Sequence, residues 1–235
     1  MISTDRPDIT QSRAIVGRGH LQIETSIARG HYGDADATTT ILTSPALVRF
    51  GLPDDLEVRA GPDGYTRADV DDLRANADEQ ETGISDPWSE VKLRLVEGEG
   101  LRPAIAVLVN PDIDPGSRAA FLRPSIRSTL DWRLPHAFSI GAMPGIVYEK
   151  TEGQRHAAGV LGLTLGKAWT TRLVTHIETT AERIASSSHG GSTVTYNFGG
   201  AYLLRDAVQI DSAVSWGANS DPADLAWTIG LSMKF

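Results

Sequence analysis

Several short stretches of the chain carry charged residues at alternating positions. Glu57 and Arg59 are two residues apart, and the same spacing recurs in Glu90, Lys92 and Arg94. Because successive side chains of a β-strand point to opposite faces, residues with this spacing share one face of a strand. Charges of both signs on one face must pair or remain hydrated. They can line a water-filled passage that selects solutes by charge, or they can pair with one another and hold a narrow interior shut.

Arginine is the commonest member of this charged set, and Arg123, Arg127 and Arg133 fall in one stretch. We therefore expect a local positive wall, although the formal net charge of the whole chain is -8. Such a wall favours anionic solutes, for example aromatic acids or acidic sugars, and the acidic total argues against nucleic acid as a partner. The predicted lumen and solute-path residues are Arg49, Glu57, Arg59, Glu90, Lys92, Arg94, Arg123, Arg127, Asp131, Arg133, His176, Glu178 and Asp211.

A hydrolytic site is the catalytic alternative for part of this set. His176 and Glu178 share one strand face, as two members of a Ser-His-acid arrangement could. The sequence contains no Gly-x-Ser-x-Gly elbow, so we interpret His176 as a member of the interior charge network. No spacing of His, Asp and Glu matches a metal-binding helix motif, and the chain has no cysteine. We predict no enzymatic activity, no metal site and no cofactor.

Strands must position these side chains, and the final stretch, residues 225–235, is the clearest of them. Large apolar residues from Leu225 to Phe235 alternate with small or polar ones from Ala226 to Lys234. The length matches the roughly 9–11 residues that a tilted strand needs to cross a bilayer. The sequence has no run of about 18 apolar residues, so we expect strands, rather than helices, to span a membrane.

The connections between the expected strands alternate between short and long. The short ones lie near Pro53, Gly98, Pro135, Ala168 and Arg205. The long ones lie near Gly33, residues 61–87, Asp114, Glu152, Ser187 and Asn219. Tight turns at one end and long loops at the other are typical of outer-membrane barrels and not of β-sandwiches.

The sequence therefore predicts an all-β fold: a closed antiparallel transmembrane β-barrel of about twelve strands with up-and-down topology. Both chain ends should lie on the tight-turn side, and residues 225–235 should pair with the strand that begins near Gly19. We expect an irregular ladder at Pro45. The long excursion of residues 61–87 is expected to be an outer loop, with a short helical turn within residues 68–81.

Residues 1–18 are polar, contain Pro7 and Gly17, and show no clear period. We expect them to form an N-terminal extension or a lumen plug that precedes the barrel of residues 19–235. In the plug interpretation Asp5, Arg6 and Asp8 pair with interior charges; the alternative is a frayed terminus. The start has no signal-peptide core, so an exported protein would be present here in its mature form with an added Met.

Four stretches resemble a known family, the outer-membrane β-barrel transporters associated with meta-pathway phenol degradation in Gram-negative bacteria. They are residues 3–8 (STDRPD), residues 19–24 (GHLQIE), residues 48–52 running into 56–59 (VRFGL and LEVR), and the closing strand to Phe235. The resemblance implies an outer-membrane location, a transport role, and Phe235 as the terminal signal for the barrel-assembly machinery. The chain departs from the family by its aromatic content of only 6%.

Taken together, these features predict a monomeric bacterial outer-membrane channel or transporter for small, anionic or aromatic solutes, surrounded by membrane lipid. Two alternatives stay open. One is an outer-membrane barrel with a closed lumen that is structural or hydrolyses lipid. The other is a soluble all-β binding protein.

Overall fold

The computed structural model describes residues 2–7, 9–33, 37–62, 64–72, 77–84, 87–111, 124–151, 154–185, 192–219 and 222–235. Within these ranges the chain is almost entirely extended, with one 3-10 turn, η1 (Pro135–Ala137). No helix in this part of the chain has the length and apolar character needed to cross a membrane.

Fifteen strand segments form one antiparallel sheet. They are β1 (Leu21–Gly33), β2 (Ala37–Thr43), β3 (Ala46–Gly51), β4 (Leu56–Pro62), β5 (Tyr65–Asp72), β6 (Ala77–Ile84), β7 (Pro87–Val96), β8 (Ala104–Asn110), β9 (Ser125–Arg133), β10 (Phe138–Thr151), β11 (Gln154–Ala168), β12 (Leu173–Ile184), β13 (Thr193–Arg205), β14 (Val208–Gly217) and β15 (Leu225–Lys234).

Three pairs of segments, β2 with β3, β4 with β5 and β6 with β7, are successive parts of one strand, so the barrel has twelve strands, as predicted. The break between β2 and β3 falls at Ser44 and Pro45, where proline cannot donate to the ladder. At this point β1 changes partner: Thr25 pairs with Ala46 of β3, and Ala28 pairs with Thr43 of β2. The irregularity expected at Pro45 is therefore confirmed.

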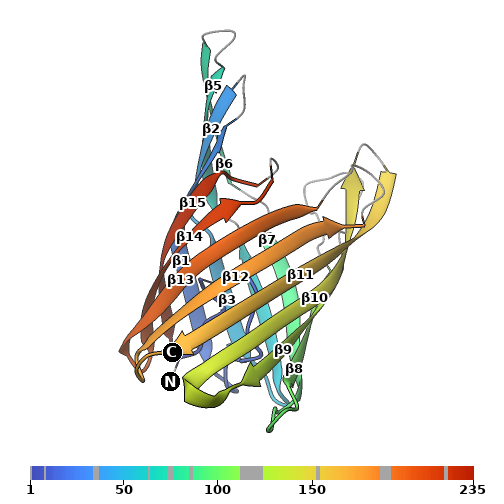
Figure 1. The fold of residues 1–235 in the computed structure, drawn as a ribbon, viewed down its shortest axis with the longest axis vertical. Coiled ribbons are helices and arrows are strands. Elements are labelled where there is room, and N and C mark those ends of the chain that lie inside the picture. Colours follow the sequence, from blue (N-terminus) through green and yellow to red (C-terminus); the bar gives the residue numbers. More distant parts are fainter. Residues whose placement is uncertain are drawn as a thin grey trace.

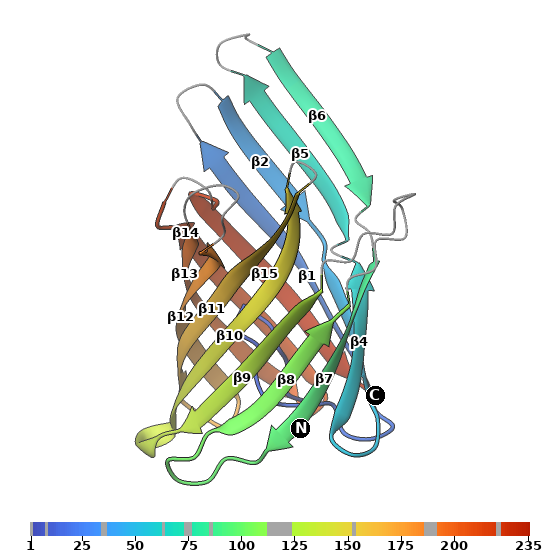
Figure 2. The ribbon, with the colours of Figure 1, turned by 90° about the vertical axis from the view of Figure 1, so that its right-hand side faces the viewer.

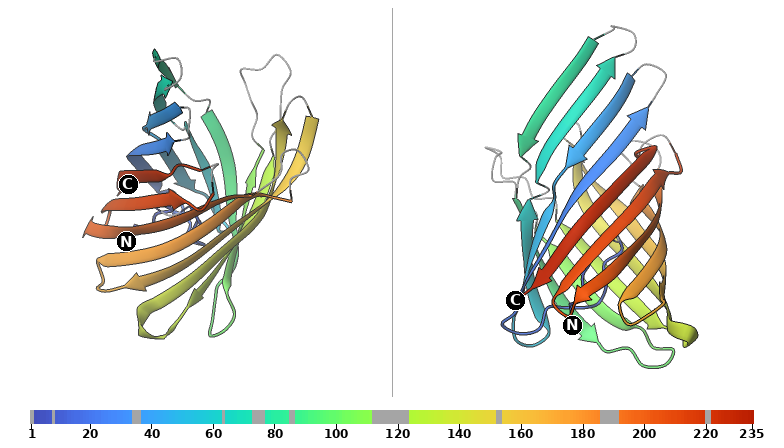
Figure 3. Two further views of the ribbon diagram at one scale, coloured as in Figure 1. Left: turned by 45° about the horizontal axis from the view of Figure 1, so that its top comes forward. Right: turned by 90° about the vertical axis from the view of Figure 1, so that its left-hand side faces the viewer.

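The barrel closes between its first and last strands. Residues from Gln22 to His31 of β1 pair with residues from Lys234 to Leu225 of β15, and the right-hand view of Figure 3 shows the two strands side by side. The main chains of Leu21 and Phe235 extend this ladder by a reciprocal pair of hydrogen bonds. Closure leaves no sheet edge along the body of the barrel, which is what a sheet surrounded by lipid requires.

The two sets of connections lie at opposite ends of the barrel as predicted, but the expected difference in length is only partly met. The connections predicted to be long near Gly33 and Glu152 are short, because β2 begins at Ala37 and β11 begins at Gln154. The tight turns lie at one end, together with both chain termini, which are at the lower end of the barrel in Figure 1. Among these turns, η1 separates β9 from β10, and Glu99 and Arg102 form an isolated bridge between β7 and β8.

At the opposite end, the prediction of an outer loop with a short helical turn is wrong. Residues 65–72 and 77–84 instead form the antiparallel pair β5–β6, which pairs through β5 with β2 and projects beyond the barrel (Figure 2). The β-branched residues Thr38, Thr39 and Thr40 favour a strand in β2, and the ladder that β2 offers outweighs the weak helical preference of residues 68–81. Gln80 and Arg67 both donate hydrogen bonds to Asp69, and these bonds lower the pKa of Asp69 below its usual value.

The two faces of the wall differ sharply in composition. Ile229 of β15 faces outward and is 60% exposed, whereas Ser232, on the inward face of the same strand, is fully buried. The outward set is apolar around the whole barrel and includes Ile27, Val91, Ile126, Ile140, Leu163, Leu165, Ile177, Phe198, Val214 and Leu231. An apolar outer belt around a closed sheet with a polar interior is the arrangement that a bilayer requires.

Candidate functional site in the barrel interior

The N-terminal segment (residues 2–17, described at 2–7 and 9–17) runs through the interior of the barrel. Ile2, Asp5, Thr10 and Val16 are buried there, with exposed fractions of 2–6%. The main-chain N–H of Ile2 donates to the carbonyl of Asp206, in the turn between β13 and β14 (2.7 Å). Arg18, directly after the segment, forms a bridge with Gly51 at the end of β3, so both ends of the segment are held at the tight-turn end of the wall.

Carboxylates of the wall bind the main chain of this segment. An extended segment without a strand partner leaves its N–H groups unpaired, and burying them unpaired is costly. Here Glu24 accepts from the N–H of Asp5 (3.2 Å), and Asp131 accepts from the N–H of Arg13 (2.6 Å). Glu178 accepts from the N–H groups of Ile9 and Thr10, and Glu57 accepts from that of Val16.

One side of the interior is filled by paired charges, which we call the charge cluster. Its members are Asp5, Glu24, Arg49, Glu57, Arg59, Glu90, Lys92 and Arg127. Arg49 lies 2.7 Å from Glu24 and 2.8 Å from Glu57. Glu90 pairs with both Arg59 (2.8 Å) and Arg127. The wall side chains come from β1, β3, β4, β7 and β9, and β4 and β7 each supply both a carboxylate and a cation.

Asp5 of the N-terminal segment is the centre of the charge cluster. Its Oδ2 lies 2.9 Å from Lys92 Nζ, 3.1 Å from Arg59 Nη2 and 3.5 Å from Arg49 Nη1. Its Oδ1 accepts from both the N–H and the hydroxyl of Ser12 (2.9 Å each). These contacts fold the segment into a turn against the charged side of the wall.

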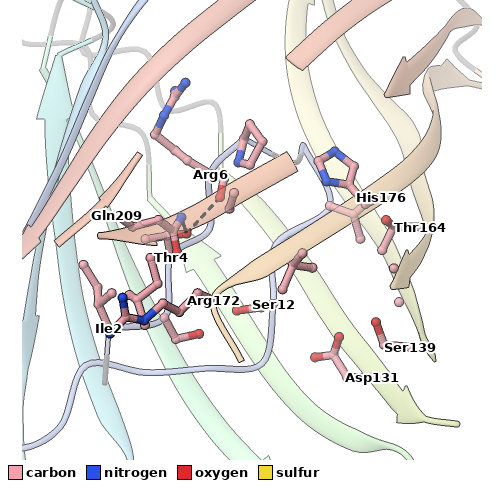
Figure 4. Close-up of a pocket in the computed structure, with 18 of the residues that line it drawn as sticks. Ile2, Thr4, Arg6, Ser12, Asp131, Ser139, Thr164, Arg172, His176 and Gln209 are labelled. Atoms are coloured by element: carbon pink, nitrogen blue, oxygen red, sulfur yellow. Dashed lines mark hydrogen bonds between the residues drawn. The ribbon is translucent and has the colours of Figure 1, made fainter. Parts of the chain in front are cut away.

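The other side of the interior holds a cavity of about 310 Å³ between the N-terminal segment and strands β9–β14. Figure 4 shows Ile2, Thr4, Arg6 and Ser12 of the segment on one side, and Ser139, Thr164 and His176 of the wall on the other. Most of the lining is small or hydroxylated: Ser3, Thr4, Thr10, Ser12, Ser139, Gly141, Thr164, Gly166, Thr171 and Ala201. Larger polar groups of the lining are Arg6, Asp131, Arg172, His176 and Gln209.

Two glycines of the wall make room for the N-terminal segment. A Cβ on Gly162 would lie 2.2 Å from Thr10 Oγ1, and a Cβ on Gly230 would lie 2.7 Å from Arg6 Nε. Next to Gly230, the Arg6 guanidinium lies 3.5 Å from Asp211 and donates to Thr228 Oγ1 (2.7 Å). Any larger residue at either glycine would push against the segment.

The predicted interior residues divide into a deep group and a rim group. Arg49, Glu57, Arg59, Glu90 and Lys92 are fully buried. His176, Glu178 and Asp211 are also buried on the inward face, while Arg127 and Asp131 are half-buried there.

Arg94 and Arg133 differ from the expectation, because both lie at the tight-turn rim. Arg94 pairs with Asp55 and Glu97, and Arg133 is exposed. β7 ends at Val96 and β9 ends at Arg133. Side chains that point inward from these strand ends therefore lie at the mouth of the barrel and not in its lumen. Arg123 and Asp8 lie outside the described residues.

The expected positive wall is offset by carboxylates where it is described. Arg49, Arg59 and Arg127 each pair with a wall carboxylate, and Lys92 pairs with Asp5 of the N-terminal segment. Sequence reasoning missed the role of carboxylates as acceptors for the N-terminal main chain. No residue spacing could have signalled it, because the partners are backbone groups far away in the chain.

A closed antiparallel barrel with an apolar belt and a polar, partly filled interior defines the outer-membrane class of β-barrel proteins. Within that class, the chain belongs to the family described as "Putative MetA-pathway of phenol degradation", whose model matches residues 4–235. The family resemblance seen in the four sequence stretches is therefore confirmed. Comparison with curated proteins gives no significant match.

Solved structures share the fold at low sequence identity. An outer membrane channel from Pseudomonas putida F1 superposes with a TM-score of 0.68 at 9% identity, covering 97% of this chain and 99% of that one. The translocator domain of the autotransporter NalP from Neisseria meningitidis gives 0.59 at 10% identity, covering 94% and 90%. The CymD monoaromatic hydrocarbon channel gives 0.51 at 10% identity, covering 93% and 88%.

Proposed function

We propose that this protein is a passive channel of the bacterial outer membrane for small solutes, monoaromatic compounds among them. The observation that carries the proposal is the cavity of about 310 Å³ inside a closed barrel, whose lining includes many short hydroxyl side chains and glycines. The names of two structures that share the fold, an outer membrane channel and a monoaromatic hydrocarbon channel, agree with it.

In this proposal the solute path follows strands β9–β14 and not the charge cluster. The charge cluster is closely paired, and desolvated pairs of this kind leave no room for a solute while Asp5 occupies its place among them. Asp131 and His176 would face the path, and Asp211 would hold Arg6 beside it, whereas Arg49, Glu57, Arg59, Glu90 and Lys92 would lie behind the N-terminal segment. Selectivity then comes from hydroxyl groups and the width of the passage more than from a ring of like charges.

We further propose that the N-terminal segment acts as a plug that narrows the path. The hydrogen bonds that its main-chain N–H groups donate to Glu24, Glu57, Asp131 and Glu178 support this, because they tie the segment to four separate strands. A segment held in this way sets the width of the passage at rest. The role covers the first 18 residues, and the barrel proper is residues 19–235.

The partners follow from the surface. The apolar belt requires membrane lipid, and we propose a monomer whose Phe235, 63% exposed, is read by the assembly machinery. Replacing Phe235 with Asp should reduce assembly into the membrane while leaving export intact, because the change removes the aromatic terminus. Heat-modifiable mobility of membrane fractions measures assembled barrel, and Lys234→Asp serves as the neighbouring control.

A structural or lipid-hydrolysing barrel with a closed lumen remains the second reading, since a translocator domain shares the same fold. We propose that the protein is not an enzyme. His176 lies beside Gly199 and next to the cavity, where it can hydrogen-bond a solute. A lipid-turnover assay on wild type and His176→Ala tests this; turnover that depends on His176 would establish the hydrolase instead.

Reconstitution into planar bilayers and liposomes tests the channel proposal. Wild-type protein should give small, steady single-channel currents, and liposomes that contain it should swell in solutes of monoaromatic size. Removing residues 2–17 should raise the conductance several-fold, since pore conductance rises with free cross-section. A barrel that gives no current and no swelling, with or without the segment, would contradict the proposal.

A further inference from the structure

The Asp5 carboxylate is held as a bound ligand would be held. It belongs to the N-terminal segment and not to the wall, and Arg49, Arg59 and Lys92 converge on it from β3, β4 and β7. The three cationic side chains are fully buried. Three desolvated cations around one carboxylate are a strong recognition site for that group, because charge-assisted hydrogen bonds gain strength in a dry interior.

The wall part of the charge cluster does not balance without Asp5. Its cations are Arg49, Arg59, Lys92 and Arg127, and its carboxylates are Glu24, Glu57 and Glu90, so these seven wall residues by themselves carry one excess positive charge. Among the described residues, Asp5 is the only ion-pair partner of Lys92. A buried ammonium without a partner is costly, so the wall requires an anion at this position.

Asp5 fits this position incompletely. Although Arg59 Nη2 lies 3.1 Å from Asp5, the Nη2 and Nε atoms of Arg59 are buried without a well-aligned hydrogen bond among the described residues. A guanidinium presents its N–H groups as a planar fork that matches the two oxygens of a carboxylate. A carboxylate that is free to rotate can use donors that Asp5, fixed by its main chain and by Ser12, leaves unused.

The cavity provides the route to this position. Thr4 and Arg6, which flank Asp5 in the chain, and Ser12, which bonds to it, all line the cavity. A solute in the cavity is therefore separated from Arg49, Arg59 and Lys92 only by the N-terminal segment. Movement of residues 2–6 would withdraw the Asp5 carboxylate from the three cations, while Gln11 and Ala14 keep their hydrogen bonds to Arg59 and Arg49.

We propose that Arg49, Arg59 and Lys92 form a binding site for a small solute monocarboxylate, and that this solute binds by displacing Asp5. The inference rests on the proposed channel function and deepens it, since it names a substrate class and a means of opening. The exchange replaces one carboxylate with another, so the buried charges stay balanced at every stage. Release of residues 2–6 widens the passage only while a suitable acid is bound.

Direct binding of benzoate to the purified full-length protein in detergent tests the site. Asp5→Asn should bind benzoate about tenfold more tightly than wild type, because the competing internal carboxylate is gone. The double variant Asp5→Asn with Lys92→Gln keeps the charge cluster neutral and should lose this binding. Asp54→Asn, which removes an exposed acid in the turn before β4, should behave as wild type. Equal benzoate affinity in Asp5→Asn and Asp54→Asn would overturn the proposal.

Displacement needs a second measurement. The chain has no cysteine, so Ile2→Cys gives a single thiol that is buried when the segment is docked. Benzoate should speed the reaction of this thiol with a hydrophilic maleimide, whereas uncharged benzamide should not. The control is Ala213→Cys, a buried thiol on β14. Equal acceleration of both thiols would mean general loosening and would overturn displacement.

These experiments separate the two proposals. Benzoate binding and thiol exposure are measured without any current, so the carboxylate site can stand even if the protein proves not to conduct. Conversely, the barrel could conduct while benzoate neither binds nor changes the reactivity of the thiol. That result would support the channel proposal and rule out the carboxylate site.

Discussion

On both sides of the barrel interior, alternate residues of each strand point inward, yet one side is filled and the other holds a cavity. On β1, β3, β4 and β7 the inward positions carry long charged side chains that meet and pair, and this side is filled. On β10–β13 the inward positions carry short residues such as Ser139, Thr164, Gly166 and Ala201, and a cavity remains. Alternation along a strand therefore decides only which residues face inward. The size of those residues decides whether the interior is closed or open.

The largest effect is expected on the filled side. Arg49→Ala should destabilise the barrel by about 3–5 kcal/mol, because it leaves Glu24 and Glu57 buried without their cation. Urea unfolding in lipid vesicles, followed by tryptophan fluorescence, measures the change in the free energy of unfolding. A loss below ~1 kcal/mol would mean that water enters the charge cluster, and the contrast between the two sides would then weaken.

An intermediate effect is expected on the open side, in conduction and not in stability. Thr164→Trp points a large ring into the cavity and should lower single-channel conductance by roughly half or more, since the passage narrows. Leu163→Trp, one residue earlier, faces outward and is the matched control. If both variants conduct as wild type does, the solute path does not follow β11.

The smallest effect is expected at the tight-turn rim, which lies beyond both the charge cluster and the cavity. Arg133→Ala should change the free energy of unfolding by no more than about 0.5 kcal/mol, because its side chain is exposed and screened by water. The same urea titration measures it beside Arg49→Ala. A loss of stability as large as that of Arg49→Ala would contradict this prediction. It would mean that the paired charges of the filled side continue to the mouth of the barrel.

The sequence was sufficient to predict the barrel, because period-2 alternation and the sorting of turns are local signals. It placed the closing strand, the Pro45 irregularity and the tight-turn end correctly. It failed for residues 65–84, where pairing with β2 decides the structure and β2 lies more than twenty residues earlier. The sequence also could not show that Arg49 and Arg59 pair with carboxylates. Alternation shows that a residue points inward, but not how deeply it is buried or which charged residues on other strands lie beside it.

The projecting edge of β6 has a consequence for how copies of the protein pack in the membrane. β6 pairs with β5 alone among the described strands, so its outer edge presents free main-chain groups above the barrel. That edge carries the exposed acids Asp78, Glu79 and Glu81. Two such edges that approach one another repel within the screening distance of about 8 Å at physiological salt. The charges thus oppose edge-to-edge pairing of two copies through β6, and a higher salt concentration should weaken that repulsion.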